Sequence, residues 1–275
     1  MTAEDIMTKS YDELTFTDDF MFCKVLENNE EICREIIELV TGKRISRISS
    51  LQKQRTIELT PNGKGIRLDV IFEGDDKIYN IEMQNMTNEA LPRRSRYYQG
   101  ILDLDMMERG KKYEELNDTT IIFICTFDPF GAGKSVYTLK QYIEEAPEIQ
   151  YNDGTNKIFL SAEAPLSESI TKEMRDFLDF VGGRSFKGDL SEKIQKAVNH
   201  AKSQTEWRKE YMFLQEKIDN AREEGLKEGR EEGEKTGIIK SIIQMKKNGM
   251  SNAQIADIME MSEEEIEAMI AENNR

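Results

Sequence analysis

The sequence predicts an α/β fold that is followed by a helical C-terminal extension. Three observations support this prediction. Residues 66–85 have the pattern of a β-hairpin, and residues 119–127 form a short apolar run typical of a buried strand. Segments with apolar residues at helical spacing lie before and after them, and the chain beyond about residue 190 is rich in charged residues.

Composition limits the possible classes of protein. With 275 residues, 38% hydrophobic and 33% charged, the chain can form one sizeable core and an appendage. No apolar run approaches a membrane span and the N-terminus lacks an apolar signal region, so we expect a cytoplasmic protein. The net charge of −15 argues against a protein that simply coats nucleic acid, because phosphate contacts require local Lys and Arg. A nuclease would have to confine its basic residues to one face.

The three cysteines, Cys23, Cys33 and Cys125, do not have the spacing of a metal site. We expect buried, reduced thiols, which agrees with a cytoplasmic location.

Residues 15–41 are predicted to form helix, with Thr17 or Asp18 as the capping residue and Gly42 at the end. A polar interruption at residues 27–30 makes two helices the alternative to one. Residues 45–60 are expected to lead into or form a strand, and residues 61–65 are expected to form a turn.

The predicted hairpin has a two-residue turn at Asp75-Asp76, which places Asp69 opposite Glu82. A shift of one residue would move these carboxylates to opposite faces, so the pattern favours this register. One face is then almost wholly apolar, with Leu68, Val70, Phe72, Tyr79, Ile81 and Met83, and the other is polar, with Arg67, Asp69, Asn80, Glu82 and Gln84.

This register has a chemical consequence. Cross-strand neighbours have Cβ atoms about 4.5–5.5 Å apart, and two carboxylates that close repel each other unless a proton or a cation lies between them. Oxygen ligands on a rigid sheet suit Mg²⁺, and Gln84 projects from the same face as Glu82. The alternative is a solvated face whose acids are neutralised by Arg67 or by a lysine.

From residue 89 to about 116 the chain is predicted to return to helix. Its start carries the densest cluster of basic and aromatic residues, in the sequence RRSRYYQ of residues 93–99. Phosphate contact by some of these arginines, Arg96 among them, is one interpretation, because a helix N-terminus favours anions. Ordinary ion pairs are the alternative, and we expect Tyr97 and Tyr98 to pack on the sheet.

Residues 119–127 are predicted to form a buried central strand. The sequence FGAGKS at residues 130–135 is not a P-loop, because Asp128 replaces the required glycine and a strand over residues 136–143 follows. A hairpin over residues 149–160 with Asp153-Gly154 at its turn, and a helix over residues 171–181, are expected next.

The only histidine, His200, lies in a polar helical segment and is expected to be solvated. No Ser-His-Asp arrangement, Cys-His arrangement or zinc cluster can be assembled from the sequence.

Gly225, Gly229, Gly233 and Gly237 recur at every fourth position in a highly charged segment. In a helix they would lie along one stripe and permit close approach of a partner, although each glycine costs roughly 1 kcal/mol against alanine. A flexible arm and a helix stabilised by self-association are the two interpretations, and the regular spacing favours the helix.

The remaining tail has two capping boxes, at residues 251–254 and 262–265, which predict helices over 252–260 and 263–271. The arrangement is similar to a helix-turn-helix. Its second helix is acidic, however, and would be repelled by phosphates. An interaction or oligomerisation module is therefore favoured over a DNA reader.

Four motifs together resemble one known family. They are TDDFMF at residues 17–22, RLDV at 67–70, IEMQ at 81–84 and RRSRYY at 93–98. They resemble the Rpn family of recombination-promoting nucleases, which are transposase-like PD-(D/E)XK proteins, and ERGKKY at residues 108–113 and the Glu-Gly repeats also fit. The wider superfamily usually has Lys where this chain has Gln84, whereas the Rpn family often has Gln.

The resemblance implies a restriction-endonuclease-like PD-(D/E)XK core, a mixed central sheet flanked by helices. It also implies a metal-dependent DNA endonuclease in which Asp69, Glu82 and the backbone carbonyl of Met83 hold Mg²⁺, with Mn²⁺ as a substitute, while Gln84 orients the water or the scissile phosphate. The other hypothesis is a catalytically inactive, oligomeric binding or regulatory protein on the same fold.

Some members of the superfamily use an acid on the first helix as a further ligand, and here Glu27 and Glu38 are the two candidates. The expected organisation is a nuclease-like domain at residues 1–185, a charged helical linker at 186–237 and a small interaction module at 238–275. DNA is the expected partner, together with a second copy of the chain bound through the C-terminal helical region.

Overall fold

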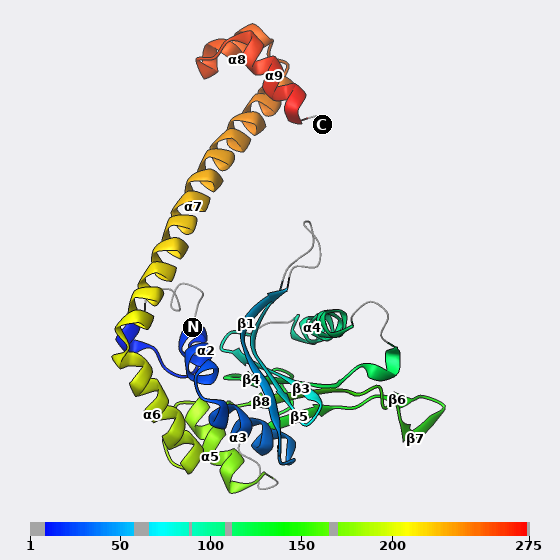
Figure 1. Ribbon diagram of the computed structural model, residues 1–275. Helices are drawn as coiled ribbons and strands as arrows, with labels where there is room; N and C mark the ends of the chain where they lie inside the picture. The colour runs from blue at the N-terminus through cyan, green and yellow to red at the C-terminus, as the bar shows by residue number, and fades with distance from the viewer. Residues whose placement is uncertain (1–8, 58–65, 88–89, 108–111, 165–169, 274–275) are drawn as a thin grey trace. The chain divides into compact units, whose positions relative to one another are not determined.

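The computed structural model describes residues 9–57, 66–87, 90–107, 112–164 and 170–273 (Figure 1). The predicted turn at residues 61–65 lies outside the described residues. The chain divides into two compact units, Met1–Tyr211 and Met212–Arg275. The first unit continues beyond residue 185, because the helix Asp189–Ser203 contributes Ile194, Val198 and Ala201 to its core.

A six-stranded mixed sheet forms the centre of the first unit, and this confirms the predicted fold class. The strand order is β1-β2-β3-β4-β8-β5. Strands β1, β2 and β3 are antiparallel, β3, β4 and β8 are parallel, and β5 is antiparallel to β8. The bounds are β1 Ile48–Ile57, β2 Ile66–Gly74, β3 Lys77–Gln84, β4 Asp118–Cys125, β5 Val136–Leu139 and β8 Thr155–Ser161.

Helices cover both faces of this sheet (Figure 1). Phe72 and Ile81 belong to one core cluster, while Ile71 and Ile78 belong to the other, because successive side chains of a strand point to opposite faces. The first cluster is covered by α2 (Asp19–Glu27), α3 (Glu30–Thr41), α5 (Lys172–Val181) and α6 (Asp189–Ser203). The second is covered by α4 (Leu91–Met106).

The N-terminal segment forms two helices, which confirms the two-helix alternative. They are preceded by a 3₁₀ turn, η1 (Tyr11–Glu13), and α3 ends at Gly42 in the left-handed conformation with φ 67°. Asp18 is the N-cap residue of α2, but its side chain makes no capping hydrogen bond.

The hairpin has the predicted turn and register. Asp75 and Asp76 have φ values of 51° and 58°, as a two-residue turn with two left-handed positions requires, and Ile71 pairs with Asn80. The Asp75 carboxylate accepts hydrogen bonds of 2.8 Å from the backbone N–H groups of Ser46 and Arg47. These bonds hold the pKa of Asp75 below its ordinary value and attach the turn to the chain before β1.

The helix after the hairpin is shorter than predicted. It ends at Met106, and Tyr113–Glu115 forms a 3₁₀ turn, η2. The physical reason is the crossover between parallel strands. A helix of 16 residues is about 24 Å long, which nearly matches the roughly 26 Å of the eight-residue strand β3. The chain then enters β4, whose burial confirms the predicted central strand.

The segment between β4 and α5 differs from two predictions. The predicted strand over residues 136–143 is split into β5 and β6 (Tyr142–Ile143), and β6 pairs with β7 (Ala146–Gln150) in a separate two-stranded sheet. The predicted hairpin around Asp153-Gly154 is wrong, because β8 pairs with β4 and β5 and not with β7. Phe159 and Leu160 are fully buried on the two faces of β8, and an interior place in the large sheet provides this burial.

The rejection of a P-loop is confirmed. Residues 130–135 form an irregular turn that leads into β5, without a helix. The Asp128 carboxylate accepts hydrogen bonds from the N–H groups of Phe130 and Gly133 and from the hydroxyl of Tyr137. These bonds organise the glycine-rich turn.

Other expectations for the first unit are met. Helix α5 begins after Thr171, whose hydroxyl accepts the N–H of Met174, and ends at Gly182. His200 is exposed on α6. The three cysteines are buried thiols and are not joined in disulfides. Within the described residues, no helix combines the length and the apolar character needed to cross a membrane.

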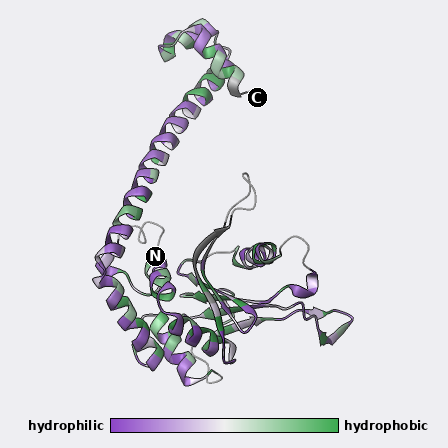
Figure 2. Ribbon diagram, in the orientation of Figure 1, coloured by the Kyte–Doolittle hydropathy of each residue, from purple (hydrophilic) through white to green (hydrophobic). Residues whose placement is uncertain are grey.

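The second unit contains most of α7 (Thr205–Lys247), followed by α8 (Asn252–Met259) and α9 (Glu263–Asn273). The four regularly spaced glycines lie within α7 and are exposed, and the middle of this helix is mostly hydrophilic (Figure 2). Both predicted capping boxes are present at α8 and α9. A small core forms where these helices meet, from Ile242, Ile255, Ala256 and Ile266.

Candidate active site

The two acidic residues of the hairpin lie where β2 and β3 separate. Paired residues of the two strands run from Gly74–Lys77 to Val70–Ile81. Beyond the pair Val70–Ile81, side-chain carboxylates accept hydrogen bonds from the backbone N–H groups. Glu82 Oε1 accepts the N–H of Asp69 at 3.1 Å, and Asp69 Oδ2 accepts the N–H of Met83 at 3.1 Å.

Glu82 lies deep in this site. Its exposed fraction is 2%, and its Oε1 also accepts a hydrogen bond of 2.9 Å from the side-chain amide of Asn80. Burial, followed by the negative charge of Asp69, raises the pKa of Glu82 well above its ordinary value. The hydrogen bonds from Asn80 and Asp69 and the charge of Arg94 oppose this shift in pKa. Without a cation, the arrangement therefore favours a proton on the carboxylate pair.

The amide of Gln84 is held between two groups. Its nitrogen donates a hydrogen bond of 2.7 Å to the backbone carbonyl of Met83, and its oxygen accepts one of 2.8 Å from Arg94 Nη1. Arg94 Nη2 donates to the hydroxyl of Tyr98 at 2.8 Å, and the guanidinium lies over the Tyr98 ring. One series of hydrogen bonds thus runs from β3 to α4 through Met83, Gln84, Arg94 and Tyr98.

The structure brings Asp69, Glu82 and Gln84 together, as the hairpin register predicts. Arg94, which the sequence showed only as one member of a basic cluster, is the arginine that contacts Gln84. Arg96 is exposed on α4. Helical spacing in the sequence could have distinguished Arg94 from Arg96. Arg94 lies three residues after Leu91 and four before Tyr98, so it lies on the same side of the helix as these two buried residues.

The expectation that both tyrosines pack on the sheet is half right. Tyr98 is buried and its ring stacks on Phe123, with centroids 6.2 Å apart. Tyr97 has an exposed fraction of 42%. The difference follows from the helix geometry, because adjacent residues are about 100° apart around the axis and only one of them can face the sheet.

The two first-helix acids lie on helices that cover the other face of the sheet. Helices α2 and α3 pack with Phe72 and Ile81, whereas Asp69 and Glu82 share the face of Ile71 and Ile78. Glu38 Oε1 accepts the backbone N–H of Ile45 at 2.8 Å, which gives this carboxylate a structural contact.

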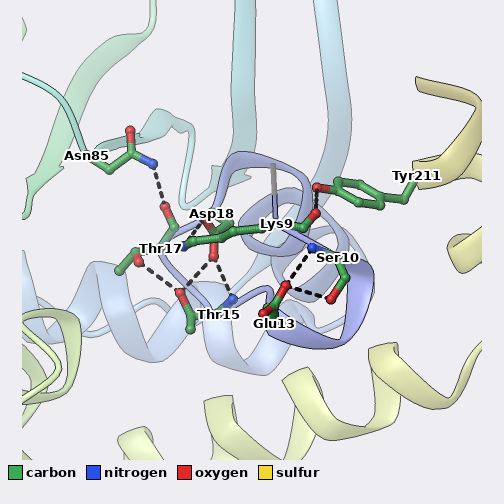
Figure 3. Close-up of polar contacts among 8 residues, drawn as sticks. All are labelled: Lys9, Ser10, Glu13, Thr15, Thr17, Asp18, Asn85 and Tyr211. Atoms are coloured by element: carbon green, nitrogen blue, oxygen red, sulfur yellow. Dashed lines mark hydrogen bonds and ion pairs between the residues drawn. The ribbon is translucent and has the colours of Figure 1, made fainter. Parts of the chain in front are cut away.

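The N-terminal motif reaches the end of β3 through one hydrogen bond. Asn85 follows Gln84, and its side-chain amide donates to the carbonyl of Thr17 at 3.2 Å (Figure 3). The next residue, Asp18, accepts hydrogen bonds from the N–H and hydroxyl of Thr15 and forms a 2.7 Å ion pair with Lys9. These contacts fix the loop before α2 against the strand that carries Glu82.

The donor atoms of this site fit a hard divalent cation. Two carboxylates and the carbonyl of Met83 provide oxygen ligands only, which suits Mg²⁺ or Mn²⁺. A cation between Asp69 and Glu82 would also balance two charges that otherwise repel. Among the described residues no group of three or more His, Cys, Asp or Glu side chains is arranged to hold a metal. Water and substrate oxygens would complete the coordination, as is usual for Mg²⁺.

Comparison with known families agrees with this geometry. A model of the PD-(D/E)XK nuclease family transposases matches residues 16–178, which is more than half of the chain. The chain belongs to this family. The matched residues include the hairpin, α4 and the sheet, so membership and fold class both accord with the sequence-based prediction. Comparisons with curated proteins and with solved structures gave no match.

Membership in this family supports a nuclease- or transposase-like function. PD-(D/E)XK nucleases generally use divalent metals, and the family implies DNA as the substrate.

Proposed function

We propose that the protein is a metal-dependent DNA endonuclease, and that Asp69, Glu82 and Gln84 carry its activity. The observation that supports this proposal best is the cross-strand carboxylate pair. One carboxylate is fully buried and the other is half-buried beside it, and each accepts a backbone N–H from the opposite strand. Such a pair is unfavourable for folding alone, because burial of like charges opposes ionisation.

Asp69, Glu82 and the carbonyl of Met83 would hold Mg²⁺ or Mn²⁺. When bound, the cation would activate a water and stabilise charge on the phosphodiester during cleavage. The chain contributes rigid placement of its ligands, because both carboxylates are fixed by backbone N–H groups of a sheet.

Gln84 would orient the water or the scissile phosphate. Its amide is already fixed by the Met83 carbonyl and by Arg94, so little conformational entropy is lost when substrate binds. Arg94 would supply a positive charge beside Gln84, at the position where the wider superfamily usually has a lysine. Arg96 remains the sequence-based candidate for contact with a DNA phosphate, and its exposure on α4 is compatible with that role.

The second candidate is a catalytically inactive, oligomeric regulatory protein on the same fold, acting in the cytoplasm like the enzyme. The glycine stripe of α7 leaves room for self-association, because an added Cβ at any of the four glycines would meet nothing within 4 Å. Close approach of a second copy is therefore sterically open. In either function we expect a homo-oligomer through the C-terminal helices.

The test is cleavage of supercoiled plasmid with Mg²⁺ or Mn²⁺, with and without chelator. Wild type and Asp69→Ala are compared after circular dichroism has established that both are folded. Metal-dependent nicking that is lost in the variant supports the endonuclease. Well-folded wild type that nicks under no metal or salt condition would support the regulatory protein. Equal nicking by both proteins would point to a contaminant or to an active site elsewhere in the chain.

A further inference from the structure

A fully buried asparagine lies beside the proposed metal ligand. Asn80 is in the middle of β3, and its exposed fraction is zero. It pairs with Ile71 on β2 and with Ile121 on β4, and both isoleucines are buried. A side-chain amide in this apolar row loses its hydration, which is costly unless hydrogen bonds replace the lost water.

The hydrogen bonds of Asn80 replace only part of that water. Its Nδ2 donates to Glu82 Oε1 at 2.9 Å. Its Oδ1 is one of the buried side-chain atoms that have no hydrogen-bond partner within the described part of the chain. The unpaired Oδ1 loses its hydration without compensation, a cost that an apolar residue of the same shape would not have. A role in packing does not account for a polar residue here.

The side-chain hydrogen bond of Asn80 is made to Glu82, the proposed metal ligand. Residues two apart on a strand project from the same face, so Asn80 and Glu82 are side-by-side neighbours. Glu82 Oε1 receives two donors, the Asn80 amide and the backbone N–H of Asp69 at 3.1 Å. Two donors on one oxygen fix the rotation of the carboxylate plane.

The second carboxylate oxygen has a different environment. No hydrogen bond within the described residues involves Glu82 Oε2. The carboxylate is thus anchored through one oxygen and offers the other as a ligand. Such outer partners of ligating side chains commonly set metal affinity.

We propose that Asn80 is a positioning residue, which anchors Glu82 through Oε1 so that Oε2 is presented to the divalent cation. This inference rests on the proposed function, since it requires Glu82 to be a metal ligand. Asn80 touches neither substrate nor metal and acts only through Glu82.

The deciding variant is Asn80→Leu, which removes the donor but keeps a side chain of similar volume. Ile78→Leu is the matched control, because Ile78 lies on the same strand and face but has no hydrogen bond to Glu82. Mn²⁺ binding by the full chain is measured by calorimetry, together with the midpoint of thermal unfolding without metal. We expect Asn80→Leu to weaken Mn²⁺ binding roughly 10- to 100-fold, with an unfolding midpoint no lower than that of wild type. Ile78→Leu should change Mn²⁺ affinity less than about twofold.

Two further measurements make the outcome unambiguous. The alanine in Asn80→Ala is smaller than asparagine and cannot clash. If Asn80→Leu does not fold, the Mn²⁺ affinity of Asn80→Ala therefore tests the positioning role instead. Plasmid nicking at saturating Mn²⁺ should recover in the variants, because the defect is in metal affinity. A merely structural role would instead lower the unfolding midpoint and leave Mn²⁺ affinity at the wild-type value, and that result would overturn the proposal.

Failure of the positioning role and failure of the proposed function give different results. If wild type binds Mn²⁺, Glu82→Gln abolishes binding and Asn80→Leu retains it, the role of Asn80 alone is refuted. If wild type binds no Mn²⁺, or if Glu82→Gln binds as well as wild type, the metal site itself is refuted and the role of Asn80 with it.

Discussion

Asp69 and Glu82 each accept a backbone N–H from the strand that carries the other. Glu82 Oε1 bonds to the N–H of Asp69, and Asp69 Oδ2 bonds to the N–H of Met83, both at 3.1 Å. The sheet therefore holds two carboxylates together at the point where the pairing of β2 with β3 ends. The repulsion between them opposes folding in the absence of a cation and favours binding of one.

The first prediction concerns the charge of Asp69. Asp69→Asn keeps the shape and an acceptor for the N–H of Met83 but removes one of the two charges. We expect metal-dependent nicking to fall at least about 100-fold, because metal-based charge stabilisation contributes several kcal/mol to catalysis. Stability without metal should not fall, since a repulsion is removed. Asp76→Asn, in the exposed turn of the same hairpin, should nick like wild type.

The second prediction concerns pH. The pKa of Glu82 is raised in the folded state by burial and by Asp69. Its contribution to stability is thus fully present below the unfolded pKa and is lost as the pH rises through the folded pKa. Without metal, the free energy of unfolding of wild type should fall relative to Glu82→Gln between pH 5 and pH 8. Chemical denaturation at each pH measures both free energies of unfolding. A difference between the two proteins that stays constant across this range would refute the raised pKa.

Metal affinity should have the opposite dependence on pH. A proton on the Asp69–Glu82 pair competes with the cation, so Mn²⁺ binding should strengthen as the pH rises from 5 to 8. Calorimetry in buffers with different ionisation enthalpies should detect release of protons on binding.

The third prediction separates Arg94 from Arg96. Arg94 contacts Gln84, so Arg94→Met should lower kcat by about 10- to 100-fold through misplacement of the Gln84 amide. Arg96→Met should leave kcat nearly unchanged. If Arg96 contacts a phosphate, this variant should weaken DNA binding and reduce the slope of log K against log salt by about 1.

Steady-state nicking and a salt titration of DNA binding measure both effects. An unchanged kcat in Arg94→Met would exclude a role for this arginine in placing Gln84. An unchanged salt slope in Arg96→Met would exclude the phosphate contact.

The fourth prediction concerns the glycine stripe of α7. Gly229 and Gly233 are exposed, so replacing both by Leu should preserve the helix, because Leu has a higher helix propensity than Gly. If a second copy packs on this stripe, the larger side chains will prevent close approach and reduce self-association. Sedimentation equilibrium measures the mass, with helicity checked by circular dichroism. An unchanged oligomer would place the interface elsewhere.

Local sequence patterns account for much of this structure. The hairpin register follows from a period of two, because a one-residue shift would move Asp69 and Glu82 to opposite faces, and Asp75 and Asp76 take the two left-handed positions of the turn. The capping boxes at Ser251 and Ser262 form as predicted, since a capping box is a contact between residues three apart. The same register brings Asp69 and Glu82 together.

Tertiary contacts account for the rest. Strand β8 pairs with β4 rather than with its neighbour β7, because Phe159 and Leu160 need burial on both faces. Gln84 pairs with Arg94 and not with Arg96 because of the orientation of α4 about its own axis, which determines the residues that face the sheet. The burial of Glu82, and with it the raised pKa, arises when α4 covers this face. Register and capping depend on residues close in the chain or paired through one turn, whereas strand order, helix rotation and burial depend on residues far apart in the sequence.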